Sequence, residues 1–214
     1  MLHSSEPPSR RPVLTPNYPK VVLALGAVIA ATSLIWFASP HPYDMHILNA
    51  AALIGGPENA FLRQPLGPYA PYVLHIFLHG DMTHLLLNLF ALLVLGRIVA
   101  LAFGRSQAAA LGFLGFFLFC AIAGGVFQMF VFALSGGGAA IGASSAISGL
   151  IPAFGYVRSG WSGAFSFGVG WLAINVAIAF FGDALGLPIA WAAHIGGLFA
   201  GFAFPVFVGL VRRA

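Results

Sequence analysis

The chain has 214 residues, of which 60% are hydrophobic and only 7% are charged. Soluble domains usually carry about 25% charged residues, so the composition excludes an ordinary soluble protein and predicts an all-α polytopic membrane protein. The formal charge of +4 does not indicate nucleic-acid binding, because the basic residues stand singly between apolar runs, as topology signals do. The single cysteine, Cys120, lies in an apolar run and provides no disulfide framework.

The first part of the chain changes abruptly from polar to apolar. Residues 1–19 are rich in Pro, Ser and Arg and lack an apolar period, which predicts a disordered cytoplasmic tail. Residues 20–38 are almost wholly apolar and long enough to cross about 30 Å of hydrocarbon. A cleaved signal peptide is the competing interpretation of this start. The apolar run is long for a signal peptide and lacks a small-x-small cleavage site, which favours a retained span.

Residues 39–70 form a long, proline-rich loop with a half-apolar middle. Loops of this length are uncommon as simple connectors and are often functional or partly inserted into the membrane. The later apolar runs predict five further spans, at residues 81–102, 107–134, 144–157, 161–181 and 188–211. We therefore expect one membrane domain of six spans over residues 20–211.

The distribution of basic residues tests this arrangement. With the N-terminus in the cytoplasm, eight of the nine Lys and Arg residues fall on the cytoplasmic side and only Arg63 falls outside. The eight are Arg10, Arg11, Lys20, Arg97, Arg105, Arg158, Arg212 and Arg213. This asymmetry is what the positive-inside rule requires, so we expect a multi-pass protein with a cytoplasmic N-terminus. Short loops and the lack of an evident transit peptide favour a bacterial inner membrane, with a mitochondrial inner membrane as the alternative.

Polar residues inside apolar spans are costly and are therefore candidates for function. Ser144 lies at the outer end of the fourth span, where a helix N-terminus favours negative charge, although this is also an ordinary position for a helix N-cap. His194 lies roughly 9 Å into the sixth span, which also starts outside. His84 and Asn88 share a helix face near the outer end of the second span. These groups are thus expected at one depth in the membrane.

A serine and a histidine at matched depth suit acyl transfer. A neutral histidine can take the hydroxyl proton, and the backbone N–H of Ser144 with His84 and Asn88 can donate to the oxyanion. No carboxylate is expected beside His194 to orient it, because Asp183 lies in the loop before the sixth span and Asp81 lies near the second span. A Ser–His dyad is therefore expected and not a triad.

Small residues at four-residue spacing support the pairing of the fourth and sixth spans. Ser145 and Gly149 form one such pair, and Gly197 and Gly201 form the other. Small-x-x-x-small patterns let helix backbones approach closely in membranes. We therefore expect these two spans to pack together near the serine and the histidine.

Three motifs resemble the rhomboid intramembrane serine proteases. Residues 79–88, HGDMTHLLLN, resemble the H-x-x-x-x-H-x-x-x-N of that family's second span. Residues 142–144, GAS, resemble the G-x-S at the start of its fourth span. Residues 193–201, AHIGGLFAG, resemble the A-H-x-x-G-x-x-x-G of its sixth span, and the order of the spans agrees over residues 20–211.

The resemblance implies a six-transmembrane-helix rhomboid-like bundle without a cofactor. It implies that Ser144 is the nucleophile, that His194 is the general base, and that His84, Asn88 and the Ser144 N–H form the oxyanion hole. Substrates of that family are single-span membrane proteins, cut in or near the membrane where their helix is locally destabilised. The long first loop would then be half inserted beside the active site, and span five with the following loop would gate substrate entry.

Two positions depart from the family pattern. Ser145 stands where the family usually has glycine, which reduces backbone freedom at this turn. Ser148 stands where the family often has an aromatic residue stacked on the histidine. We therefore expect either that His194 is held less firmly or that Ser148 forms a hydrogen bond within the site. Ser145 and Ser148 are alternative nucleophiles, but only Ser144 follows the G-x.

Other interpretations of the polar residues are less well supported. A rhomboid-like protein that binds membrane clients without cutting them would be indicated by loss of the serine or the histidine, and both are present. A small transporter predicts paired broken helices and polar residues near the midplane. A metal site at His75, His79 and His84 is not favoured, because no Glu accompanies them as in H-E-x-x-H. Gln128 and Asn175 are interpreted as interhelical hydrogen-bonders.

Overall fold

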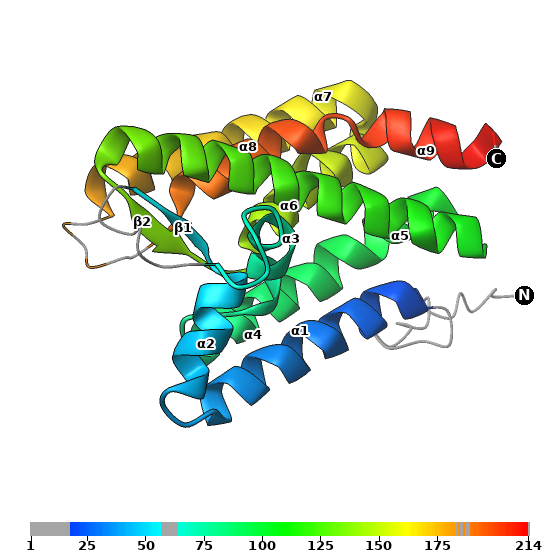
Figure 1. Cartoon of the computed structure of the whole chain (residues 1–214). Helices are drawn as coiled ribbons and strands as arrows, with labels where there is room; N and C mark the ends of the chain where they lie inside the picture. Colours follow the sequence, from blue (N-terminus) through cyan, green and yellow to red (C-terminus); the bar gives the residue numbers. More distant parts are fainter. Residues whose placement is uncertain (1–17, 57–63, 183, 185, 187–188, 214) are drawn as a thin grey trace, which may run out of the picture.

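The computed structural model describes residues 18–56, 64–182, 184, 186 and 189–213. Most of the expected N-terminal tail and Arg63 lie outside these residues. The described part is an array of helices with one small two-stranded sheet at one end (Figure 1). The α-helices are α1 Lys20–Ala38, α2 Tyr43–Ala51, α3 Pro71–Leu74, α4 Met82–Ala91, α5 Arg97–Phe103, α6 Gln107–Ser135, α7 Ser144–Phe181, α8 Trp191–Gly201 and α9 Phe204–Arg213.

The second expected span is one continuous helical segment, Met82–Phe103. A π-helical stretch, Leu92–Gly96, joins α4 to α5 within it. The side chain of Asp81 caps α4 by accepting a hydrogen bond from the backbone N–H of His84 at 2.8 Å, which satisfies a donor of the first turn. Asp81 therefore fixes where this span begins.

Helix α7 consists of two arms that run in opposite directions. Its backbone is non-helical at Ser159 and Gly160, and Gly160 has φ +61°, which glycine adopts without steric cost. Ser148 and Trp171 are hydrogen-bonded to each other although a straight helix would separate them by roughly 34 Å. The expected boundary between spans four and five is thus confirmed as a reversal of the chain.

The described helices give a range for the number of spans. Four described helices are long and apolar enough to cross a membrane, and α8 with α9, bent by 46°, makes a fifth. The start of α1 and the end of α9 lie at the same end of the bundle (Figure 1). Counting the two arms of α7 separately gives six helical segments, which is compatible with the six crossings expected from the sequence, and that number stays a prediction. The sixth segment begins at Trp191 and is broken after Gly201, where a continuous span was expected.

Helix α8 packs against α6 and both arms of α7. A Cβ at Gly197 would collide with the carbonyl oxygen of Ser145, and one at Gly201 would collide with that of Gly149. The four residues of the two small-x-x-x-small patterns are therefore in direct backbone contact, as the sequence predicted. This contact holds the first arm of α7 beside α8.

The long first loop is anchored to the turn that precedes α7. It contains α2 and strand β1, Leu53–Gly55, which pairs antiparallel with β2, Gly138–Ala140. Leu53 lies opposite Ala140 in this pairing. The sequence predicted neither strand. The pairing joins the first loop to the segment that leads into Ser144.

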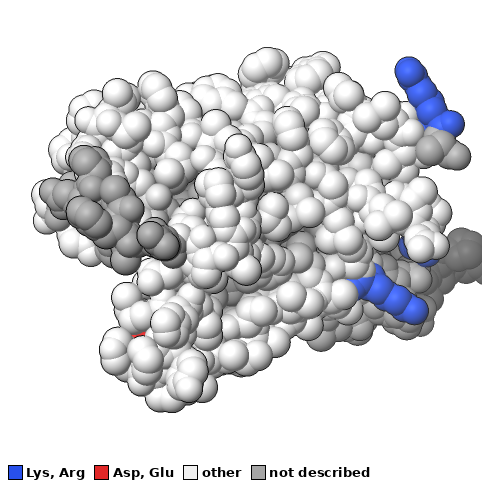
Figure 2. All heavy atoms as spheres, in the orientation of Figure 1, with Lys and Arg blue, Asp and Glu red and all other residues white. Residues whose placement is uncertain are grey.

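Basic side chains gather at the end of the bundle opposite the sheet. Figure 2 shows Lys and Arg of the visible face at the end where α1 begins and α9 finishes. Arg212 and Arg213 lie in the last turn of α9, and Lys20 opens α1. Both described ends of the chain thus carry basic residues at the same end of the bundle, and the side of the membrane that this end faces stays a prediction.

Candidate active site

Ser144 is the first residue of α7 and faces His194 of α8. The Ser144 Oγ lies 2.8 Å from Nε2 of His194, a hydrogen-bonding distance. Ser144 is half-buried, whereas only 7% of the His194 surface is exposed. The two residues stand 50 positions apart in the chain and meet because Gly197 lets α8 approach the first turn of α7. A hydroxyl and a possible base are thus in contact inside the apolar bundle.

A third side chain holds the other nitrogen of His194. Oδ1 of Asn175, on the second arm of α7, lies 2.8 Å from His194 Nδ1. Asn175 is fully buried, and its amide nitrogen donates to the backbone carbonyl of Trp171 at 2.9 Å. The sequence classed Asn175 only as an interhelical hydrogen-bonder; its spacing of four from Trp171 and its place in an apolar span were the available signals.

Ser148 forms hydrogen bonds within the site, which was the second of the two outcomes expected from the sequence for this position. Its hydroxyl donates to the Ser144 carbonyl at 2.7 Å and accepts from the indole N–H of Trp171 at 3.0 Å. The Trp171 ring lies against the His194 ring with centroids 5.9 Å apart and planes tilted by 32°. An aromatic residue therefore does contact the histidine, but it comes from the second arm of α7.

Ser145 and Ser148 are not placed as nucleophiles. Each is 1% exposed, and each hydroxyl is already engaged. The hydroxyl of Ser145 lies 3.0 Å from Nε2 of His75, whose Nδ1 lies 2.9 Å from the Pro71 carbonyl. That carbonyl can only accept, so Nδ1 of His75 carries the proton and Nε2 accepts from Ser145. Burial lowers the pKa of His75 to about 4, which keeps this ring neutral.

His84 lies against the turn that leads into Ser144. Gly142 has φ +121°, and a Cβ there would stand 2.8 Å from Cε1 and Nε2 of His84. Only glycine fits both requirements at this position. The Gly80 N–H points at Nδ1 of His84 at 3.4 Å, which leaves the proton on Nε2, the atom nearest the turn. His84 is therefore a donor beside the nucleophile turn.

Asn88 lies one helical turn beyond His84 on the same face of α4 and is 7% exposed. Its amide nitrogen donates to the His84 carbonyl at 2.9 Å. The amide is thus paired within its own helix in this structure. Of the residues expected in the oxyanion hole, His84 contacts the nucleophile turn directly and Asn88 supports it from the next turn.

The remaining histidine of the first motif, His79, contacts α1, α4 and the residue that precedes α7. Its Nδ1 lies 3.0 Å from Ser33 Oγ of α1, and its Nε2 lies 3.4 Å from the Ala143 N–H. Its ring meets that of His84 edge-on at 4.9 Å. Burial, with a smaller contribution from His84, lowers the pKa of His79 to about 3.

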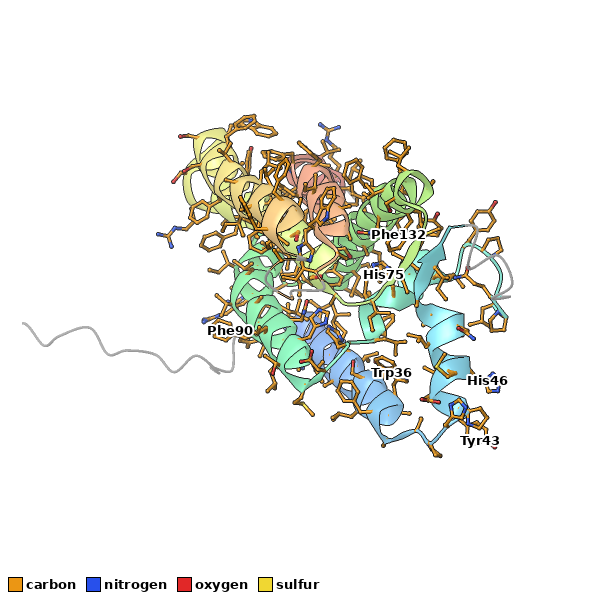
Figure 3. The ribbon with its side chains drawn as sticks, turned by 90° about the vertical axis from the view of Figure 1, so that its left-hand side faces the viewer. Trp36, Tyr43, His46, His75, Phe90 and Phe132 are labelled. Atoms are coloured by element: carbon orange, nitrogen blue, oxygen red, sulfur yellow. The ribbon has the colours of Figure 1, made fainter. Side chains whose placement is uncertain are left out.

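His75, His79 and His84 thus each form hydrogen bonds with other protein groups. Among the described residues, no group of three His, Cys, Asp or Glu side chains is placed to hold a metal ion. Figure 3 shows His75 near the centre of the molecule, whereas His46 and Tyr43 of α2 lie at its periphery. The donors and acceptors of the site suit proton transfer between a hydroxyl and an imidazole.

The family assignment rests on residues 67–210, which match the family model described as Rhomboid domain. The chain belongs to the rhomboid family. This is a family of intramembrane serine proteases that also has inactive members. No curated protein matches the chain. The match covers all three motifs with the serine, both oxyanion candidates and the histidine, so the site lies wholly within the rhomboid domain.

Proposed function

We propose that this rhomboid is an intramembrane serine endopeptidase that cuts a peptide bond in or near the transmembrane segment of single-span membrane proteins. The observation that carries the proposal is the 2.8 Å contact between Ser144 Oγ and His194 Nε2 at a helix N-terminus. Ser144 is the nucleophile and His194 is the general base. The competing function is a rhomboid that binds membrane clients without cutting them.

The reaction proceeds through an acyl-enzyme. Ser144 Oγ attacks the scissile carbonyl carbon while its proton passes to His194 Nε2. The tetrahedral intermediate collapses, and His194 returns the proton to the departing amine. A water molecule then repeats the sequence on the ester and frees Ser144. No step requires a metal or a cofactor.

Donors near Ser144 stabilise the oxyanion. The backbone N–H groups in the first turn of a helix have no partner within the helix, and Ser144 opens α7. The ring of His84, which lies against Gly142, offers a second donor. Asn88 joins them if its amide turns from the His84 carbonyl toward the oxyanion. Removal of one such donor typically lowers kcat by about 10²–10³-fold.

The proposed substrate and location are supported by the chemistry of the site and by the charge pattern of the chain. A peptide bond inside a helix has its carbonyl and N–H shielded, so the scissile segment must unwind before Ser144 can attack it. The charge distribution supports a cytoplasmic N-terminus with the site in the outer half of the bilayer. We place the protein in a bacterial inner membrane.

Cleavage by the purified protein tests the proposal. The wild type and the Ser144→Ala and His194→Ala variants are incubated in detergent with a single-span model substrate. We expect cleavage by the wild type and its loss in both variants. Retained folding and substrate binding without any cleavage by the wild type would overturn the protease assignment in favour of client binding.

A further inference from the structure

Five hydrogen bonds form a closed ring through the site. Each lies between 2.7 and 3.0 Å. In order, the ring runs from the Ser144 hydroxyl to His194, Asn175, Trp171 and Ser148, and back to the Ser144 carbonyl. Three helical segments contribute: the two arms of α7 and α8. The ring includes three residues, Asn175, Trp171 and Ser148, that lie outside the three motifs quoted above.

Groups that can only donate or only accept fix the direction of every hydrogen bond in the ring. The Trp171 carbonyl can only accept, so the atom of Asn175 facing it is the amide nitrogen, and Oδ1 faces His194. An amide oxygen can only accept, so Nδ1 of His194 carries the proton. Nε2 is then unprotonated, so it accepts the hydrogen bond and the Ser144 hydroxyl donates it. The indole N–H can only donate, so Ser148 accepts from Trp171, and the Ser144 carbonyl can only accept, so the Ser148 hydroxyl donates to it.

We propose that Asn175 is a positioning residue that sets the tautomer and ring orientation of His194. Ser144, His194 and Asn175 then form a chain of hydrogen bonds, called the relay below, in which only Ser144 and His194 exchange a proton. The inference rests on the proposed function and adds a residue to it. The opposite tautomer would place a proton on Nε2, where the ring could not accept the Ser144 proton. Asn175 excludes that tautomer, because Nδ1 would then present a lone pair to an amide oxygen.

Trp171 also restricts the orientation of the His194 imidazole, because the indole lies against the face of the imidazole. The indole is held in place at its N–H by Ser148, and its contact with His194 supplies the aromatic neighbour that Ser148 cannot provide. Trp171 and Asn175 lie four residues apart on one arm, so one helix face supports both an edge and a face of the imidazole. Replacement of the usual aromatic residue by Ser148 is therefore compensated from the second arm of α7.

Asn175→Leu keeps a similar side-chain volume and removes the acceptor. We expect it to lower kcat and the rate at which a fluorophosphonate labels Ser144 by about 10- to 100-fold, with KM within about 2-fold. Asn175→Asp keeps an acceptor toward Nδ1 and should restore most of the labelling rate. Val176→Ala, at the neighbouring exposed position, should leave both rates unchanged. A purely structural role would not be rescued selectively by aspartate.

The position of the His194 proton can be read without activity. In protein with ¹⁵N-labelled histidine, the two neutral tautomers give distinct nitrogen shifts, and the signal of His194 is identified by its loss in His194→Gln. We expect the Nδ1–H form in the wild type and a mixture in Asn175→Leu. An Nε2–H wild type, or wild-type labelling by Asn175→Leu, would overturn the relay while leaving the protease proposal intact. A wild type that neither labels nor cleaves would overturn the protease proposal and the relay built on it.

Discussion

His75 holds the nucleophile turn at two points. Its Nε2 accepts from Ser145 at 3.0 Å, and its carbonyl accepts from the Gly142 N–H at 2.8 Å. Both partners lie close to Ser144 in the chain, and both contacts come from the short helical segment His75–Phe77, which follows the first loop. Ser145, which departs from the family pattern, thus forms a second serine–histidine pair that is buried and serves to anchor the turn.

Ser145→Ala tests this anchor. The substitution leaves Nε2 of His75 buried without a donor, which should lower the free energy of unfolding by about 1–3 kcal/mol. Thermal unfolding in detergent measures the effect, and a His75→Ala, Ser145→Ala double-mutant cycle isolates the coupling between the two side chains. Additive effects of the two substitutions would show that the contact contributes no coupling energy.

The neutral state of His75 makes stability depend on pH. Its folded pKa is about 4, below its ordinary value of 6.5, so the unfolded chain binds a proton that the folded chain excludes. Stability is therefore complete above pH 6.5 and declines as the pH falls toward 4, by about 3 kcal/mol in all for this group. The melting temperature of His75→Gln should fall less than that of the wild type between pH 7.5 and 5.0. Equal decreases would contradict the buried neutral ring.

The contact between α8 and α7 predicts an asymmetry among glycines. Gly201→Ala would place a methyl group on the Gly149 carbonyl, whereas Gly209 of α9 has open space around it. We expect Gly201→Ala to cost about 1–3 kcal/mol and Gly209→Ala to be neutral or slightly stabilising through helix propensity. Melting temperatures of the two variants measure this, and equal values would show that the close approach is not required.

The orientation in the membrane can be measured with single cysteines. The native Cys120 is fully buried and should not react with a membrane-impermeant maleimide. Asp44→Cys, on the first loop, should be labelled in intact bacterial cells, and Arg212→Cys should be labelled only after permeabilisation. The reverse pattern would place the N-terminus and the basic end of the bundle outside.

The chain alone predicted the pairing of Ser144 with His194 because the depth of each residue in its span can be counted from charge and hydropathy. The β1–β2 pairing could not be predicted, because its three-residue strands lack a periodic pattern. Asn175 was not predicted as a site residue for a related reason. Its contact with His194 depends on how the second arm of α7 packs against α8, which the local sequence does not encode. The contact of Trp171 with Ser148 likewise depends on the reversal of the chain within α7.

Selective chemical modification of Ser144 tests the central claim most directly. The purified wild type is treated with a fluorophosphonate, and the modified residue is located by mass spectrometry of its peptides, with Ser144→Ala and His194→Ala treated in parallel. We predict one adduct, on Ser144, that is absent in Ser144→Ala and strongly reduced in His194→Ala. An adduct on Ser145 or Ser148, or labelling of Ser144 that does not depend on His194, would contradict the assignment of nucleophile and base.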